Sequence, residues 1–350
     1  MIEWNEGYTV SYRLMRVNEL TWMDSEAASG ITRASITRDA TDDVPLLESS
    51  SISAILPQGE RFQEGWYRLE ALAIDSLGAF ERRSLCTMLY ESGGSTALPG
   101  REEVELVGKS VLQPASDRKF LAGAYVPKGV DGAQYVADLL RESFPGPVEV
   151  QGSFTMDDYL VFSAGASYLQ VIWRVLQSAG WCMQIDGDGR IFIQEKPKDP
   201  KLVISDSTAS LIQPTLDKSF DLEGIPNRYF ASYYEESSTA TNEDPTSMTS
   251  YQARGRWIDM VDTSPSRVNG ETMYAYARRR LEEESTIVQS YSYTRRFDPS
   301  VLPFDLVRAS VSSLGFEGDV RVLTQKISCG RQIEVSEKAG REVALWQANG

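Results

Sequence analysis

The segment from Ser167 to Gln194 constrains the fold of this chain most, because it reads as an amphipathic helix followed by a tight β-hairpin. Its apolar residues recur first at the spacing of one buried helical face and then in the alternation of strands. They are Leu169, Ile172, Trp173 and Leu176 in the helix, and Met183, Ile185, Ile191 and Ile193 in the hairpin. Gly180 suits the C-terminal end of the helix. The segment therefore predicts the core of an α+β domain, with Trp173 and Trp181 as core residues, and it carries no catalytic group.

The turn of this hairpin, Asp-Gly-Asp-Gly from Asp186, resembles the start of a calcium-binding loop. An EF-hand loop needs oxygen ligands at positions 1, 3 and 5 and a glutamate at position 12. Counted from Asp186, the fifth residue is Arg190 and the twelfth is Pro197, so the match fails. Asp-Gly between alternating apolar residues is the usual signal of a hairpin turn. We therefore predict a turn without a metal ion.

The chain has 350 residues, enough for two or three domains, and a net charge of −15. This acidic balance argues against a protein that reads DNA sequence, although solubility alone explains it equally well. The sequence contains no histidine, which excludes Ser-His-Asp and Cys-His catalysis and removes the commonest metal ligand. The three cysteines, Cys86, Cys182 and Cys329, are far apart and predict isolated buried thiols. We predict no catalytic, cofactor-binding or metal-binding residue.

Two features argue against a membrane role for this chain. The N-terminal residues lack the basic region and apolar run of a signal peptide. The most apolar long window, from Tyr159 to Trp181, is interrupted by polar residues that include Arg174, so it predicts a buried helix. We expect no membrane insertion.

Strand-like segments follow one another through the first part of the chain, separated by turn signals. They run from Tyr8 to Val17, Ile31 to Asp39, Trp66 to Ile74, Arg83 to Tyr90 and Glu103 to Leu112. This spacing predicts a sandwich or barrel. A helix that Asp131 can cap, reaching Ser143, then marks the start of an α+β region that continues to about Pro214.

Strands return after Pro214. They run from Asn227 to Tyr234, Thr286 to Thr294, Leu306 to Ser312, Asp319 to Ser328 and Arg331 to Glu337. After the first of them, the polar segment from Glu235 to Ser250 predicts a flexible loop. A helix is predicted from about Gly270 to Glu284, with Met273, Tyr274, Ala277 and Leu281 on one face. The β-rich start and the β-rich end are candidates for two copies of one barrel.

Other motifs have simpler structural explanations. The acidic pairs Asp157–Asp158 and Glu282–Glu284 could serve glycoside hydrolysis, which needs a separation and unequal pKa values that a sequence does not give. Arg278–Arg280 alternates with those glutamates at helical spacing, which predicts an ion-paired, solvated face. The glycines Gly93, Gly94 and Gly100 fit no phosphate-binding motif. The many aromatic residues leave a carbohydrate-binding or carbohydrate-active protein open as an alternative.

The chain resembles the central hub proteins of phage tails and related contractile injection systems. The similarity rests on GASYLQVIWRVLQSAGWCMQIDGDGRIFI, on LEGIPNRYFASYYE from Leu222 to Glu235, on PFDLVRASV from Pro303 to Val311, and on DVRVLTQKISCGRQIEVSEKAGREVAL. One departure is PFDLV, which has Pro-Phe where the family has Pro-Gly before Asp305. The similarity spans most of the chain.

This resemblance implies an α+β, mainly β fold with two tube-protein-like β-barrels and an inserted α+β domain. It places the first barrel at residues 1–113 and the inserted domain at 114–214, with the loop and helix of 237–285 packed on it. The second barrel takes residues 215–236 and 286–350.

The same resemblance implies a structural function in the virion tail tip or baseplate, after assembly in the host cytoplasm. A homotrimer with pseudo-sixfold symmetry would join the hexameric tail tube, or a distal tail protein, to a central spike or tip protein. The tape measure protein is a further implied partner. Genomic DNA would pass through the ring without specific binding, and an acidic lumen would repel it. A distal-tail ring protein is an alternative.

Overall fold

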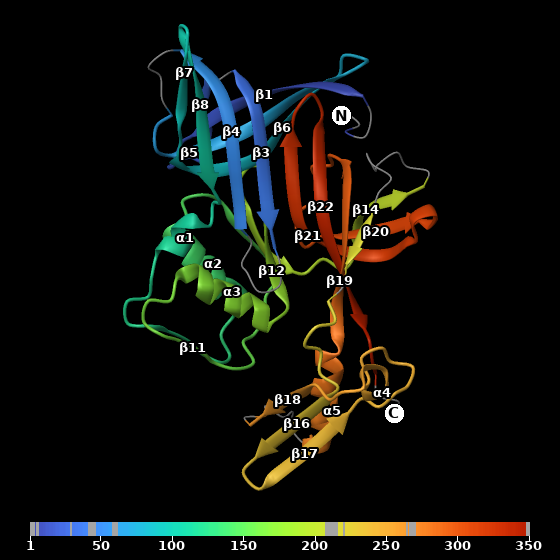
Figure 1. Cartoon of the computed structure of the whole chain (residues 1–350). Coiled ribbons are helices and arrows are strands. Elements are labelled where there is room, and N and C mark those ends of the chain that lie inside the picture. Colours follow the sequence, from blue (N-terminus) through green and yellow to red (C-terminus); the bar gives the residue numbers. More distant parts are fainter. Residues whose placement is uncertain are drawn as a thin grey trace. The chain divides into compact units, whose positions relative to one another are not determined.

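The computed structural model describes residues 4, 7–28, 30–40, 47–57, 62–206, 216–219, 221–263, 265 and 271–347. The chain divides into two compact units (Figure 1). Unit 1 comprises Met1–Leu216 and Ser292–Ala339, and unit 2 comprises Asp217–Tyr291 and Gly340–Gly350. The predicted boundary at Pro214 and the predicted helix start at Gly270 lie outside the described residues. The three-domain division of the sequence stays a prediction.

A large β-sheet organises unit 1. Its N-terminal strands are β1 (Tyr8–Val17), β2 (Asp24–Ala28), β3 (Ile31–Asp39), β4 (Leu47–Pro57), β5 (Trp66–Asp75), β6 (Phe80–Ser92), β7 (Ser95–Leu98) and β8 (Arg101–Lys109). The C-terminal part adds β14 (Pro200–Ser205), β19 (Thr286–Arg296), β20 (Leu306–Val311), β21 (Phe316–Cys329) and β22 (Ile333–Ala344). Strands β19 and β22 continue from unit 1 into unit 2. The predicted mainly β, α+β fold class is confirmed.

The sheet differs from the expected pair of barrels because it stays open. Its main path through the described strands runs β15-β19-β22-β21-β3-β4-β8-β6-β5-β1-β2, and the two end strands do not meet. Strands β3 and β21 pair antiparallel, from Ala34 opposite Cys329 to Asp39 opposite Thr324. The two β-rich regions therefore use these strand edges to join each other, and those edges are not available to close a barrel around each region.

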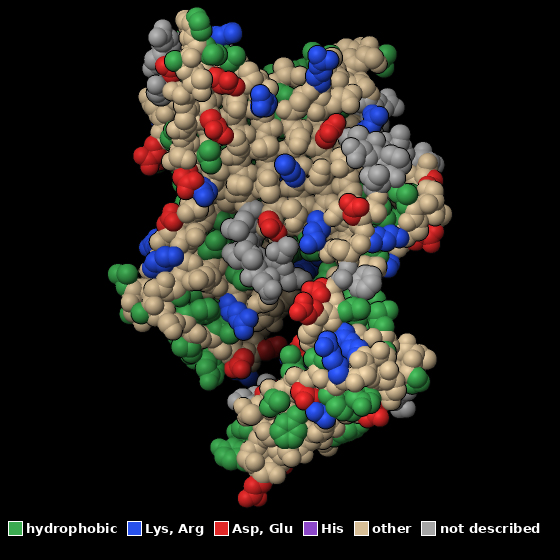
Figure 2. All heavy atoms as spheres, viewed as in Figure 1, with side chains coloured by type: hydrophobic (Ala, Val, Ile, Leu, Met, Phe, Trp, Pro, Cys, Tyr) green, Lys and Arg blue, Asp and Glu red, His purple; other side chains and the backbone are tan. Residues whose placement is uncertain are grey.

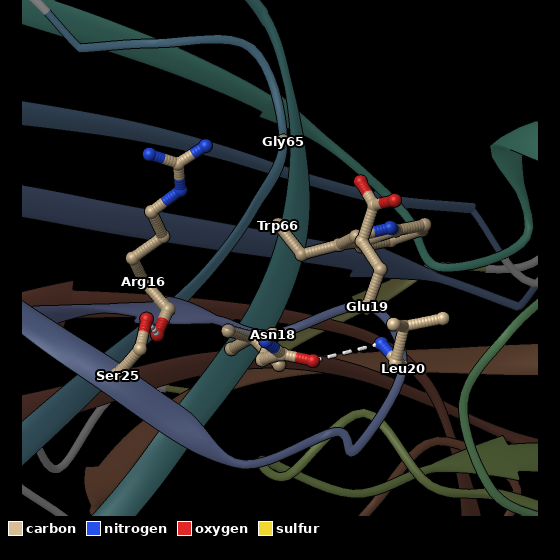
Figure 3. A pocket seen from close by; sticks show the side chains of 8 residues that line it. Arg16, Asn18, Glu19, Leu20, Ser25, Gly65 and Trp66 are labelled. Carbon is tan, nitrogen blue, oxygen red and sulfur yellow. Dashed lines mark hydrogen bonds between the residues drawn. The ribbon is translucent and has the colours of Figure 1, made fainter.

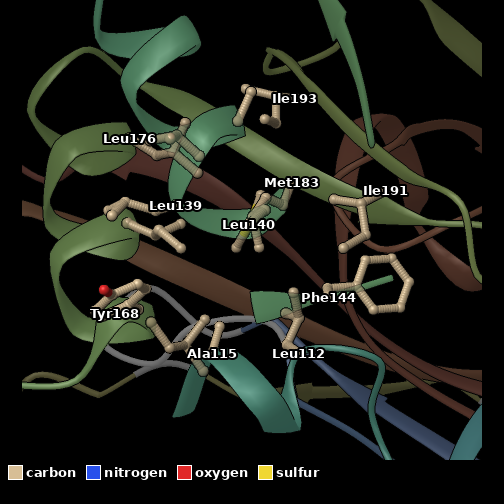
Figure 4. Close-up of a cluster of buried hydrophobic side chains, with 14 of the residues drawn as sticks. Leu112, Ala115, Leu139, Leu140, Phe144, Tyr168, Leu176, Met183, Ile191 and Ile193 are labelled. Carbon is tan, nitrogen blue, oxygen red and sulfur yellow. The ribbon is translucent and has the colours of Figure 1, made fainter. Parts of the chain in front are cut away.

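The inserted α+β region contains α1 (Gln113–Asp117), β9 (Ala124–Val126), α2 (Gly132–Ser143), β10 (Val148–Gln151), β11 (Leu160–Phe162), α3 (Tyr168–Ser178), β12 (Trp181–Ile185) and β13 (Ile191–Glu195). Asp131 caps α2, as predicted, and Ser167 with Gln170 forms a capping box at the start of α3. The apolar faces of both helices pack with the hairpin β12–β13 in one core (Figure 4). The predicted helix and hairpin of Ser167–Gln194 are confirmed, with Trp181 buried and Trp173 half-buried.

Unit 2 contains β15 (Asp217–Ser219), β16 (Arg228–Tyr233), β17 (Glu236–Thr241), α4 (Tyr251–Arg254), β18 (Asp259–Asp262) and α5 (Met273–Glu284). Helix α5 packs on β16 and β17, and its buried residues include Met273, Tyr276, Ala277 and Leu281. The prediction for Tyr274 is wrong, because this side chain is 56% exposed. Tyr276, which lies three residues after Met273, is on the buried face instead of Tyr274.

The predicted flexible loop from Glu235 to Ser250 is also wrong. The segment forms β17 and then a turn in which Asn242 and Thr249 are fully buried. The Asn242 amide donates hydrogen bonds to the hydroxyl oxygens of Ser247, at 3.0 Å, and Thr249, at 3.3 Å. Because these polar groups satisfy one another, the segment is ordered without large apolar side chains.

Candidate functional site

Unit 1 offers shallow clefts lined mainly by polar residues. One, of about 430 Å³, is lined by Arg16, Asn18, Glu19, Leu20, Ser25, Gly65 and Trp66 among others (Figure 3). Its polar side chains already bond to the protein: Asn18 accepts the Leu20 N–H at 2.9 Å, and Arg16 donates to Gln63 at 2.7 Å. A second cleft, of about 580 Å³, lies beside Tyr8 and Gly330. In the first cleft the Ser25 hydroxyl donates to the Arg16 carbonyl at 3.0 Å, so this hydroxyl bonds to the backbone and not to a carboxylate.

The acidic groups that the sequence raised as candidates do not converge on a site. Asp157 and Asp158 are exposed, and Asp158 accepts the backbone N–H of Tyr159. The glutamates of α5 pair with Arg278, Arg279 and Arg280 at contacts of 2.6–3.6 Å, so the predicted ion-paired face is confirmed. Within the described residues, no group of three or more His, Cys, Asp or Glu side chains could hold a metal ion. None of the described helices is long and apolar enough to cross a membrane.

All three cysteines are buried free thiols. Burial raises the pKa of Cys182 and of Cys329 to about 12 and raises that of Cys86 as well. The thiolate form is therefore scarce at neutral pH, and the cysteines act as packing residues.

The Asp-Gly-Asp-Gly turn docks the inserted region on the N-terminal strands. The Thr87 hydroxyl donates to the Gly187 carbonyl at 2.9 Å, and the Ser84 hydroxyl donates to Asp188 Oδ1 at 2.6 Å. A Cβ atom on Gly187 would lie 1.9 Å from the Ser84 carbonyl oxygen, so only glycine fits this approach. The turn therefore has a structural role, and its contact with β6 requires glycine at position 187.

Two further donors converge on the Asp188 carbonyl oxygen. Arg68 Nη2 and Trp22 Nε1 each donate to it at 2.9 Å. Trp22 has a φ of 56°, and its ring packs edge-on against Trp66 and Phe144, with ring centroids at 5.3 and 4.9 Å. Its aromatic contacts and its hydrogen bond together join the loop after β1 to the inserted region.

A second junction joins the hairpin β12–β13 to the C-terminal strands at Asp305. Asp305 is fully buried and accepts from Gln184 Nε2 at 2.9 Å and from the Leu302 N–H at 2.8 Å. Phe304, at the position of the family's glycine, has a φ of 72°. Its ring is buried in the core of the inserted region, so the turn forms although the glycine is absent.

Hydroxyl side chains cover the solvent face of the central sheet. We give the name hydroxyl face to a set of outward residues on six adjacent strands. Its hydroxyl residues are Ser292, Thr294, Ser336, Thr324, Ser328, Ser35, Thr37, Ser49, Ser51 and Ser53. The other residues among them are Arg33, Lys109, Arg296, Lys326, Lys338, Asp39, Glu103, Glu105, Glu334 and Val107. Ser35 pairs across strands with Ser51 and Ser328. In Figure 2 the surface over β3, β4 and β21 is mostly tan, with scattered acidic and basic side chains.

The hydroxyl face is close to neutral. Its basic residues, Arg33, Lys109, Arg296, Lys326 and Lys338, are nearly balanced by Asp39, Glu103, Glu105 and Glu334. The whole chain, in contrast, carries a net charge of −15. The face crosses the β3–β21 pairing without interruption, so it includes strands from both β-rich regions. Such a surface is well hydrated and carries no concentrated charge.

Solved structures with the same arrangement identify the fold. A tail protein from Neisseria meningitidis aligns with a TM-score of 0.64 at 14% identity, over 96% of this chain and 97% of that one. The chain has the fold of phage tail proteins. The 43 kDa tail protein of prophage MuSo2 from Shewanella oneidensis gives a TM-score of 0.61 at 12% identity, over 94% and 97%.

Related machinery outside phages gives a similar result. A chain of the Francisella PdpA–VgrG complex gives a TM-score of 0.56 at 7% identity, over 96% of this chain and 58% of that one. No family model and no curated protein sequence matches this chain. The similarity to these solved structures is therefore one of fold.

Proposed function

We propose that this chain is a structural, non-enzymatic component of a virion tail tip or baseplate, where it forms a trimeric hub. Three copies, each with two β-rich regions side by side, supply the six positions needed to match a hexameric tail tube or distal tail protein. The β3–β21 pairing supports this reading, because it joins the two regions edge to edge within one chain.

The observation that carries the proposal is the hydroxyl face on a tail-protein fold. We assign this face to the wall of the channel through which DNA leaves the particle. Uncharged hydroxyl groups displace no counterions from DNA, so they add little to the affinity for a polyanion. The acidic lumen implied by the resemblance is not what this face offers, because its charges nearly cancel. Smooth passage then depends on hydration rather than on repulsion.

The remaining partners follow from the same role. The opposite end of the hub holds the central spike or tip protein, and the tape measure protein occupies the channel before ejection. The Francisella chain with this fold comes from a complex of two proteins, which supports a role within an assembly. Assembly takes place in the host cytoplasm, and the mature location is the tail.

The oligomeric state tests the proposal. Native mass spectrometry or mass photometry of the chain, alone and with the tube and spike proteins from the same tail, is expected to give a trimer. A six-copy ring would indicate a distal-tail ring protein instead. A persistent monomer that joins neither partner would contradict the proposal, and glycan binding by that monomer would favour the carbohydrate-binding alternative.

A further inference from the structure

The hairpin β16–β17 of unit 2 ends in an exposed aromatic turn. Tyr233 pairs with Glu236 across the hairpin, so Tyr234 and Glu235 form a two-residue loop. The Tyr234 side chain is 91% exposed and that of Tyr233 is 47% exposed, with their rings edge-on at 4.5 Å. The neighbouring strand β18 pairs with β16 only as far as Ala231, so the turn lies past the end of that pairing, at the tip of the hairpin (Figure 1).

The backbone of this loop does not favour a tyrosine. Tyr234 has a φ of 52°, in the left-handed region, where hairpin loops normally use glycine, asparagine or aspartate. The Tyr234 ring gains little packing energy within unit 2 to offset this strain, since it is almost entirely in solvent. A strained, solvent-exposed aromatic residue is typical of a contact surface whose benefit appears on binding.

The charge around the turn limits the kind of partner. Glu235 and Glu236 follow the two tyrosines and are exposed, so the turn is an aromatic projection beside two carboxylates. Its complement is an apolar pocket with a basic rim. The turn needs a basic rim on its partner, and a protein other than this acidic chain is better placed to supply one.

We propose that the turn Tyr233–Glu236 docks into a basic-rimmed apolar pocket on a different protein of the tail. The inference rests on the proposed function, because it takes the partner from the tail particle. It adds a specific attachment point that is separate from the hydroxyl face.

A photoreactive residue tests where the turn binds. We would place p-benzoylphenylalanine at position 234 of the full chain, and in a control at position 274, and irradiate assembled tails. Tyr274 is a suitable control because it is an exposed tyrosine of the same unit, on α5. The expected result is a cross-link from position 234 to one other tail protein, identified by mass spectrometry, and none from position 274 to that protein.

Variants test the energetic role. Tyr234→Gly suits the left-handed backbone, so unit 2 is expected to fold normally while the affinity for the cross-linked protein falls about tenfold. Glu235→Lys should also weaken binding, and Tyr274→Ser should not. Unchanged affinity in Tyr234→Gly, a cross-link to a second copy, or no cross-link in tails that contain the chain would overturn this inference alone. Absence of the chain from tails would overturn the proposed function together with it.

Discussion

Gln184 Nε2 donates to Asp305 Oδ1 at 2.9 Å, and this bond between two buried side chains joins the inserted hairpin to the segment just before β20. Gln184 also donates to the Pro303 carbonyl at 2.7 Å and accepts from Gln194. The junction is therefore a small polar network whose members depend on one another.

Asp305→Ala should destabilise unit 1 by about 3 kcal/mol, because it leaves the Gln184 amide, the Leu302 N–H and Lys201 without their carboxylate. Thermal or urea unfolding measures this loss. Asp319→Ala, which removes the exposed partner of Arg308, is the matched control and should leave the midpoint nearly unchanged. Equal effects of the two variants would contradict the role of the junction.

Phe304→Gly tests the departure from the family's Pro-Gly turn. Glycine relieves about 1–2 kcal/mol of left-handed strain, but removing a buried phenylalanine costs about 3–5 kcal/mol. We therefore expect a net destabilisation of about 2 kcal/mol in chemical denaturation. A gain in stability would mean that the ring contributes little to the core.

Gly187→Ala should release the docked turn, since the added Cβ would lie 1.9 Å from the Ser84 carbonyl oxygen. The expected cost is about 2 kcal/mol. Hydrogen exchange should quicken in both β6 and the hairpin β12–β13. Gly94→Ala, where no atom lies within 4 Å of the new Cβ, should leave exchange unaltered.

Glu48 gives the fold a pH dependence. Burial raises its pKa above the ordinary value of 4.5, despite the ion pair with Arg38 at 2.9 Å, and the nearby Asp186 acts in the same direction. A carboxyl whose pKa is raised on folding stabilises the fold most below its unfolded pKa, and that contribution is lost as pH rises through the folded pKa. Over this range above pH 4.5, the melting temperature of Glu48→Gln should fall less steeply with rising pH than that of the parent. Parallel pH profiles would contradict this assignment.

If the hydroxyl face lines the channel, positive charge added to it should slow the release of DNA. Ser328→Arg combined with Ser336→Arg places two guanidinium groups on exposed positions of the face, where they can bind phosphate. DNA release from assembled particles should slow several-fold at low salt and recover as salt is raised. Ser237→Arg, at an exposed position of unit 2, serves as control. Equal DNA release rates in all particles would contradict the assignment of the hydroxyl face to the channel wall.

Much of the inserted region could be predicted from the sequence, because helix caps and apolar spacing depend on residues that are close together in the chain. Asp131 and the helical face of Leu169, Ile172 and Leu176 are examples. The ordered segment around Asn242 was missed, because its stability comes from polar groups that satisfy one another only when folded. The hydroxyl face was missed for a related reason: Ser35, Ser51 and Ser328 are unremarkable in sequence and meet only across paired strands.

Electron cryo-microscopy of the assembled tail tip would show the copy number of this chain and the side of the sheet that faces the channel. We expect three copies of this chain around the tail axis, with Ser35, Ser51 and Ser328 of each copy facing the lumen. A different copy number, or a hydroxyl face turned away from the axis or covered by another protein, would contradict it.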